Sequence, residues 1–193
     1  MSRPRVYLAG PDVFLPDAVA VGEAKRAVCA AHGLEGIYPL DGERPGEAPG
    51  TREAGLAIAA ANEAHMRGCD AIIANLSPFR GPSADPGTCY ELGFMRALGR
   101  RCFAYSNDPR PFVARIRAAL GRDLGVLPDG RMVGADGLTL ESFELGDNLM
   151  LDHAVIADDN SVVMIEEAGL AASQAFARCV ALAARVLLGE FRG

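Results

Sequence analysis

The sequence is poor in the residues that build metal sites and disulfide frameworks. Its 193 residues include five cysteines and three histidines. The cysteines are widely scattered without a CxxC pair, and the histidines show no HExxH spacing, which argues against a zinc site. An odd number of scattered cysteines also argues against a disulfide framework, so we expect reduced and mostly buried thiols. We therefore expect no metal and no other cofactor.

Two further absences narrow the class of ligand. Neither GxGxxG nor GxxxxGK[ST] occurs, so the chain has neither the dinucleotide fingerprint nor a P-loop. Nineteen basic residues stand against twenty-five acidic ones, which gives a net charge of −6, whereas polyanion-binding surfaces usually carry a basic excess. We expect a small neutral molecule rather than nucleic acid as the partner.

Long apolar segments are missing as well. No apolar run reaches the ~18 residues needed to span a bilayer, and the N-terminus lacks the apolar segment of a signal peptide. Half of the residues are hydrophobic and 23% are charged, which is typical of a globular protein. We expect one domain over residues 1–193, located in the cytoplasm and not at a membrane.

Short apolar segments alternate with amphipathic ones along the chain. The predicted strands cover residues 5–10, 37–40, 71–76 and 102–105. The predicted helices cover residues 17–33, 52–68, 88–98, 112–120, 148–156 and 165–188. Residues 41–50 are rich in glycine, proline and acid and are expected to form a surface loop, whereas no element is predicted for residues 121–143.

This alternation implies βαβ crossovers and hence a parallel sheet between layers of helices. The expected fold is an α/β, flavodoxin-like or Rossmann-like three-layer sandwich with four to five strands. Ligands of such sheets bind at the carboxyl ends of the strands, near the point where the strand order reverses. The ends of the first and third strands should therefore bring Tyr7 toward the loop of residues 77–87.

That loop and the helix after it carry two carboxylates, Asp85 and Glu91. Glu91 lies near a helix N-terminus, whose partial positive charge favours the ionised form that a nucleophile needs. The same spacing from Thr88 to Glu91 is that of a capping box, in which Glu91 would be purely structural. Asp85 is either a solvated turn residue or the second acid of a retaining glycosyl transfer. The residues alone leave these interpretations open.

Five blocks of sequence occur together in the order found in a known family. They are YLAGP (7–11), CDAIIANL (69–76), PFRG (78–81), DPGT with ELGF (85–94) and NLM (148–150). With these blocks the chain resembles the nucleoside 2-deoxyribosyltransferases over most of residues 5–150. The resemblance implies a flavodoxin-like fold and exchange of the base of a 2′-deoxyribonucleoside through a covalent deoxyribosyl-enzyme.

The resemblance also implies roles for individual residues. Glu91 is expected to be the nucleophile, Tyr7 to orient it through a hydrogen bond, and Asp85 to contact the base and protonate its departing nitrogen. Asn148 is expected to reach into a neighbouring subunit's site and bind the 5′-hydroxyl, which implies a homo-oligomer with a dimer as the minimal unit. The expected substrate-binding residues are Asn62, Gly10, Pro11, Phe14, Pro78, Gly87, Asn148 and Met150.

Two positions bear on the substrate class. Asn62 stands where well-known members of the family carry an aspartate that helps to hold the base, so a different base preference is expected. Asp12 lies in the first loop, where related nucleotide hydrolases bind a 5′-phosphate, and its charge should favour an unphosphorylated nucleoside. Hydrolysis of the N-glycosidic bond in nucleosides or nucleoside monophosphates, and non-catalytic nucleoside binding, are the alternatives.

Overall fold

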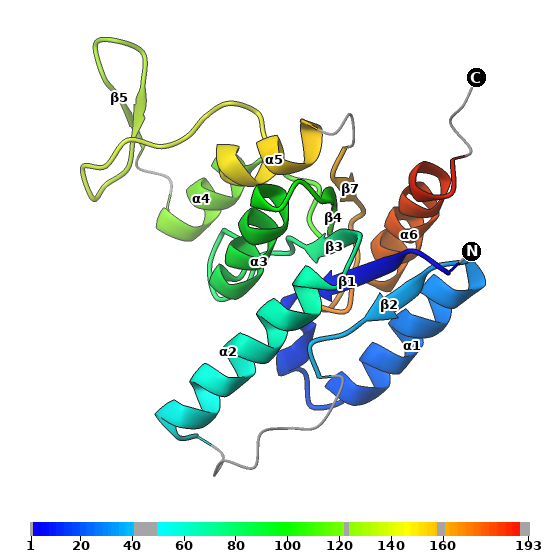
Figure 1. Cartoon of the computed structure of the whole chain (residues 1–193). Coiled ribbons are helices and arrows are strands. Elements are labelled where there is room, and N and C mark those ends of the chain that lie inside the picture. Colours follow the sequence, from blue (N-terminus) through cyan, green and yellow to red (C-terminus); the bar gives the residue numbers. More distant parts are fainter. Residues whose placement is uncertain (1, 41–49, 122–123, 158–160, 190–193) are drawn as a thin grey trace.

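A parallel sheet of five strands forms the centre of the computed structural model, which describes residues 2–40, 50–121, 124–157 and 161–189 (Figure 1). In spatial order the strands are β2 (Glu35–Ile37), β1 (Arg5–Ala9), β3 (Ala71–Asn75), β4 (Arg101–Ser106) and β7 (Val163–Met164). Every neighbouring pair in this sheet is parallel. This order is the flavodoxin-like one, and the expected fold class is confirmed.

Helices cover both faces of the sheet. On one face lie α1 (Ala18–Ala31) and α6 (Ser173–Leu187), and on the other lie α2 (Arg52–Arg67), α3 (Pro86–Ala97) and α5 (Leu149–Ile156). Because side chains alternate along a strand, β1 directs Val6 and Leu8 toward α6 and directs Tyr7 and Ala9 toward α3. This alternation places the Tyr7 side chain on the face where Glu91 lies.

The C-terminal helix is shorter than the sequence pattern predicted. A helix from residue 165 was expected, whereas residues 163–164 form β7 and the helix α6 begins at Ser173. β7 pairs with the end of β4, and the Glu167 carboxylate accepts hydrogen bonds from the backbone N–H groups of Gln174 and Ala175. Glu167 therefore caps α6 from outside the helix, where the periodicity had placed it inside.

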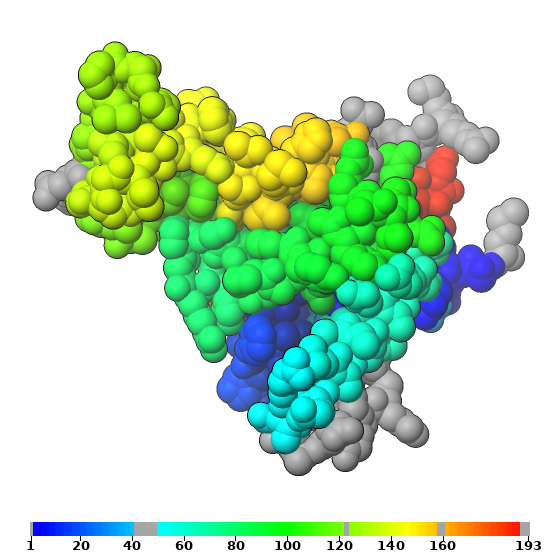
Figure 2. All heavy atoms as spheres, turned by 60° about the vertical axis from the view of Figure 1, so that its left-hand side comes forward, coloured from blue at the N-terminus to red at the C-terminus, as the bar shows by residue number. Residues whose placement is uncertain are grey.

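A hairpin occupies the region for which no element was predicted. It contains β5 (Gly125–Val126) and β6 (Met132–Val133) and follows the short helix α4 (Phe112–Leu120). Figure 2 shows this part of the chain as a lobe that projects from the body. Of the surface loop expected at residues 41–50, residues 41–49 lie outside the described part of the chain. No helix in the described ranges is long and apolar enough to cross a membrane.

A buried polar cluster holds the segment after β1, the 3-10 helix Pro11–Phe14, against the sheet. Asp12 is 0% exposed, and its Oδ2 lies 2.7 Å from Lys25 Nζ and accepts a hydrogen bond from the Tyr38 hydroxyl at 3.0 Å. Its Oδ1 accepts a hydrogen bond of 3.1 Å from Asn75 at the end of β3. A buried carboxylate needs such partners because it has lost its water. The cluster thus ties the ends of β1 and β3 together.

Gly22 in α1 packs against Tyr38, whereas Gly55 in α2 has no close neighbour. Alanine substitutions at these two glycines should therefore change stability in opposite directions. A methyl group at Gly22 would lie 2.5 Å from Tyr38 Cδ1, and the ring cannot easily move because it is buried and its hydroxyl is bound to Asp12. We expect Gly22→Ala to lower the free energy of unfolding by about 1–3 kcal/mol. Gly55 in α2 has nothing within 4 Å of such a methyl group, and Gly55→Ala should raise it by roughly 0.5–1 kcal/mol. Urea denaturation measures both, and a loss in Gly55→Ala as large as that in Gly22→Ala would contradict this packing.

Candidate active site

A cavity of about 310 Å³ opens at the carboxyl ends of β1 and β2, beside the start of α3. Figure 2 shows this side of the molecule, with the blue N-terminal residues lying between cyan α2 and the green segment that leads into α3. The cavity is lined by Gly10, Val13, Phe14, Pro39, Leu40, Ile58, Asn62, Asp85, Gly87, Thr88 and Glu91. Six of the residues predicted for the site therefore meet in one cavity, and its walls are mostly apolar.

Glu91 is held at the cavity wall by Tyr7. The Tyr7 hydroxyl donates a hydrogen bond of 2.7 Å to Glu91 Oε1, and Tyr7 itself is 0% exposed. Burial, together with the charge of Glu91, keeps the pKa of Tyr7 well above its ordinary value, so the hydroxyl remains a donor. A fully buried donor with one partner fixes the position of the Glu91 carboxylate.

The surroundings of Glu91 disfavour ionisation of its carboxyl group. Burial raises the pKa of its carboxyl to about 7, the Tyr7 hydrogen bond opposes this shift, and the charges of Asp85 and Asp12 add to it. The expected stabilisation of the carboxylate by a helix N-terminus does not dominate, because Glu91 is the sixth residue of α3 and lies beyond its first turn. Glu91 therefore exchanges its proton close to neutral pH.

The N-terminus of α3 is capped by Asp85 and not by the expected capping box. The helix α3 begins at Pro86, and its N-cap is Asp85, whose Oδ2 accepts hydrogen bonds from the Thr88 backbone N–H at 2.9 Å and from the Thr88 hydroxyl at 3.1 Å. The interpretation of Thr88 as N-cap and Glu91 as its capping partner is therefore wrong. Capping falls to Asp85, and Glu91 is left without a capping role, facing the cavity.

The structure also corrects the argument about phosphate. Asp12 was expected to repel a 5′-phosphate from the first loop, but its carboxylate is fully buried and paired with the Lys25 ammonium. Its carboxylate is thus engaged by partners in the core. Asp12 gives no reason to exclude a phosphorylated ligand.

The remaining predicted residues lie in different places. Pro11 is the first residue of the 3-10 helix and is buried, and Pro78 lines a separate cavity of about 430 Å³ beside Asn107 and Glu167. Asn148 is the N-cap of α5 and Met150 is 64% exposed beside it; neither lines the cavity that contains Glu91. Whether these residues contact a ligand stays a prediction.

Sequence reasoning missed part of the apolar wall. Val13, Pro39, Leu40 and Ile58 line the cavity but were not singled out. Ile58 is 48% exposed and Leu56 on the same helix is 56% exposed, and two exposed apolar residues so close together are a weak signal of a binding surface. At the rim the exposed ring of Phe14 stacks on Phe79, with 5.4 Å between the ring centroids.

The polar atoms of the cavity favour an organic ligand. Asn62 Oδ1 is buried against the cavity wall and has no hydrogen-bond partner among the residues described, so a ligand N–H group would satisfy it. No three side chains of His, Cys, Asp or Glu in the described ranges converge as a metal ion would require. Apolar walls, a stacking ring and two acids fit a flat heterocycle attached to a reactive carbon.

Comparisons with known proteins point to one family. A family model described as nucleoside 2-deoxyribosyltransferase matches residues 6–150. An uncharacterized protein of Schizosaccharomyces pombe is 36% identical over 160 residues, which cover 77% of this chain and 75% of that protein. A 2-desoxiribosyltransferase from Leishmania mexicana has 34% identity and a TM-score of 0.63 over 92% of this chain and 97% of that one. A conserved protein from Enterococcus faecalis V583, 18% identical with a TM-score of 0.52, shares the fold.

The raised pKa of Glu91 makes folding stability depend on pH. The folded chain keeps this proton up to about pH 7, whereas the unfolded chain loses it near the ordinary value of 4.5. Because the folded state binds the proton more tightly, this contribution to stability is present at low pH and is lost as pH rises through the folded pKa. We expect the wild type to lose roughly 2–3 kcal/mol from this group between about pH 5 and 8.

Glu91→Gln cannot ionise and should not show that loss, so its stability relative to the wild type should increase by the same amount over this range. Urea denaturation at the two pH values measures the change. The control is Glu63→Gln, because Glu63 forms a similar hydrogen bond of 2.6 Å with Tyr90 on the exposed surface. A Glu91→Gln stability that follows the wild type at both pH values would contradict the buried, proton-holding carboxyl.

Proposed function

Since the chain belongs to the nucleoside 2-deoxyribosyltransferase family, we propose that it transfers 2-deoxyribose between the nucleobases of 2′-deoxyribonucleosides. The observation that carries the proposal is the pairing of the Tyr7 hydroxyl with Glu91 Oε1 at the wall of a cavity that Asp85 also lines. One helix thus presents two acids to one cavity, and one of the two is fixed by a buried donor. Retaining transfer at a glycosidic carbon uses two acids in this way.

In the first step Glu91 is the nucleophile. Oε1 accepts the Tyr7 hydrogen bond, which leaves Oε2 to attack C1′ of the deoxyribose. A bond forms between Oε2 and C1′ while the bond from C1′ to the base nitrogen breaks, and the proton of Asp85 moves to the departing base. The free base and a deoxyribosyl ester of Glu91 result.

In the second step the incoming base takes the place of the first. A ring nitrogen attacks C1′, the ester bond to Glu91 breaks, and the proton of that nitrogen returns to the Asp85 carboxylate. Two inversions at C1′ give net retention, and both acids recover their starting state. Asp85 Oδ2 is engaged by Thr88, so Oδ1 is the oxygen that carries the proton in both steps.

The cavity supports binding of a base beside the two acids. Phe14 and Ile58 offer apolar contact area at the rim, and a nucleobase can stack on an aromatic ring. The unpartnered Oδ1 of Asn62 can accept a hydrogen bond from an N–H group of the base. These contacts would place C1′ between the base subsite and Glu91.

We also propose that a second copy of the chain completes the site. Asn148 and Met150 lie at the start of α5, outside the lining of their own chain's cavity, and Met150 is 64% exposed. The apolar side chain of Phe143, which lies close to Glu141 and Asp147, is 63% exposed as well. In a homodimer this surface could deliver Asn148 to the 5′-hydroxyl bound by the partner subunit.

Transfer is tested by chromatography. Thymidine or deoxyinosine incubated with free adenine in the absence of phosphate should yield deoxyadenosine, because adenine replaces water as the second nucleophile. Glu91→Gln should abolish the product, with a loss of at least about 10³-fold. Size-exclusion chromatography of the same preparation should show the activity in a dimer or larger species.

The outcomes separate the competing functions. Formation of free deoxyribose without any new nucleoside would show that the protein hydrolyses nucleosides and does not transfer the sugar. No turnover, with nucleoside binding unchanged in Glu91→Gln, would show a binding protein instead of an enzyme. Full activity in a monomeric fraction would contradict the contribution of a second copy but not the transfer itself.

A further inference from the structure

A second buried acid, Asp147, lies behind the loop that carries Asp85. Asp147 directly precedes Asn148, the N-cap of α5, and is 2% exposed. Its Oδ1 accepts hydrogen bonds from the Ser83 hydroxyl at 2.7 Å and from the Asn148 backbone N–H at 2.8 Å. Its Oδ2 accepts from the Ala84 backbone N–H at 3.0 Å and from Arg115 Nη2 at 2.9 Å. Two of its four donors thus belong to the residues immediately before Asp85.

Arg115 fixes Asp147 from the other side. This residue of α4 is 3% exposed, and its Nη2 also donates to the Gly146 carbonyl. Its Nε and Nη1 have no hydrogen-bond partner in the described part of the chain. A guanidinium that is buried and only partly satisfied depends strongly on its carboxylate partner, because the ion pair offsets the cost of desolvating both charges. Asp147 therefore cannot readily turn away from the loop.

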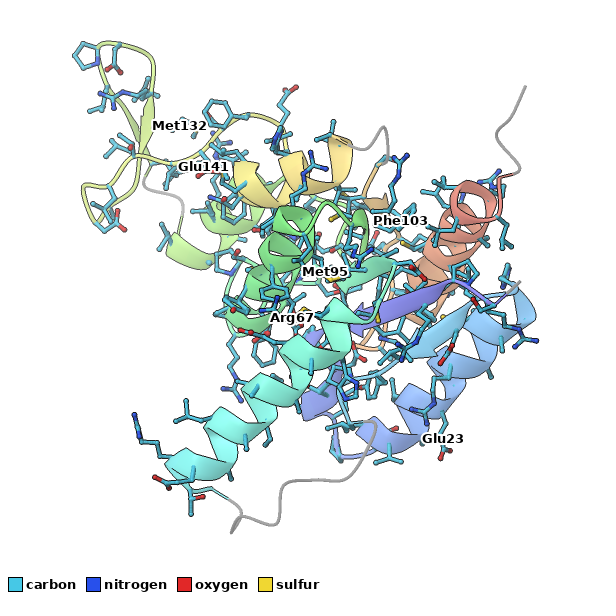
Figure 3. All side chains as sticks on the ribbon, in the orientation of Figure 1. Glu23, Arg67, Met95, Phe103, Met132 and Glu141 are labelled. Atoms are coloured by element: carbon cyan, nitrogen blue, oxygen red, sulfur yellow. The ribbon has the colours of Figure 1, made fainter. Side chains whose placement is uncertain are left out.

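The Asp85 backbone is consequently held from both directions. On its C-terminal side Thr88 binds the Asp85 carboxylate at the start of α3, and on its N-terminal side Ser83 and Ala84 are bound to Asp147. Figure 3 shows α5 lying against α3, with labelled Glu141 beside α5. The Glu141 carboxylate accepts from the Asn148 side chain and the Leu149 backbone, so the start of α5 is fixed as well.

We propose that Asp147, held by Arg115, is a positioning residue that keeps Asp85 in place to protonate the departing base. The proposal rests on the proposed deoxyribosyl transfer and adds a residue that acts through Asp85 without touching the substrate. Proton transfer requires the donor within hydrogen-bond reach of the acceptor, and a displacement of about 1 Å can cost on the order of 10²-fold in rate. The bonds to Ser83 and Ala84 prevent such a displacement.

This role predicts a dependence on the leaving base that a purely structural role does not produce. A neutral purine nucleoside needs a proton on the base as the bond to C1′ breaks. An N7-methylated purine nucleoside is already cationic, so its base leaves as a neutral molecule without that proton. In the same way 5-fluorouracil, the more acidic base, leaves with less assistance than uracil. A displaced Asp85 should therefore slow the first member of each pair more than the second.

The test compares these nucleosides in wild type and Asp147→Asn. The kcat/KM for base release is measured for two pairs of nucleosides, so that purines and pyrimidines are both covered. The first pair is 2′-deoxyguanosine and 7-methyl-2′-deoxyguanosine, and the second is 2′-deoxyuridine and its 5-fluoro derivative. An asparagine keeps one acceptor oxygen, so two of the four bonds are lost. We expect the kcat/KM of Asp147→Asn to fall at least about 10-fold for the nucleoside whose base needs a proton, 2′-deoxyguanosine or 2′-deoxyuridine. For the methylated or fluorinated nucleoside of the same pair it should fall under about 3-fold.

Two further variants keep the comparison decisive. Ser83→Ala removes only the hydroxyl donor, so it tests the same link if Asp147→Asn fails to fold, and its ratio should change in the same direction by about 2- to 5-fold. Asp129→Asn removes the acid of another Asp–Arg pair, in which Arg131 Nη2 lies 2.8 Å from Asp129 Oδ2, exposed on the hairpin. It should leave both rates unchanged. Each ratio of two kcat/KM values is measured on one preparation of a variant. A lower fraction of folded protein therefore lowers both values equally and leaves the ratio unchanged.

The outcomes distinguish this proposal from the one on which it rests. Equal losses on both members of a pair in Asp147→Asn and Ser83→Ala would show a structural role and overturn the positioning role, with deoxyribosyl transfer untouched. No base release from any of the four nucleosides by the wild type would overturn the proposed function and, with it, this role of Asp147.

Discussion

The hydrogen bond from the Tyr7 hydroxyl to Glu91 joins the two elements on which the site depends, the strand β1 and the helix α3. Tyr7 is wholly buried, so its hydroxyl would lose this hydrogen bond without gaining water if Glu91 moved away. Asp85 caps the same helix that carries Glu91. The separation of the two acids is thus set by a helix and not by a flexible loop, which is the kind of preorganisation that catalysis at a glycosidic carbon requires.

Two buried ion pairs support this arrangement. Asp12 with Lys25 fixes the segment after β1, and Asp147 with Arg115 fixes the loop before α3. Buried pairs of this kind contribute little net stability, because desolvation offsets much of the attraction between the charges. Their value here is geometric, since each carboxylate also accepts hydrogen bonds from a second element of the chain. Loss of either partner would leave an uncompensated charge in the core.

The sequence allowed the sheet, most helices and the cavity acids to be predicted, because these depend on local periodicity and on the rule that ligands bind at strand ends. The start of α3 was misplaced although Asp85-Pro86 is a recognisable N-cap with proline at the first helical position. The orientation of Asp12 and the role of Asp147 were beyond sequence reasoning. Their partners come from other elements, Lys25 on α1 and Ser83 and Ala84 some 63–64 residues away from Asp147, and only the folded chain brings them together.

The central claim is that Glu91 forms a covalent bond to the sugar during turnover, and trapping of that intermediate tests it most directly. A 2′-deoxy-2′-fluoro nucleoside slows breakdown of the deoxyribosyl-enzyme, because fluorine destabilises the positive charge that develops at C1′. After proteolysis, mass spectrometry should locate the 2-fluoro-2-deoxyribosyl group on Glu91 of the wild type, and the Glu91→Gln protein should carry none. An adduct on any other residue would contradict the account.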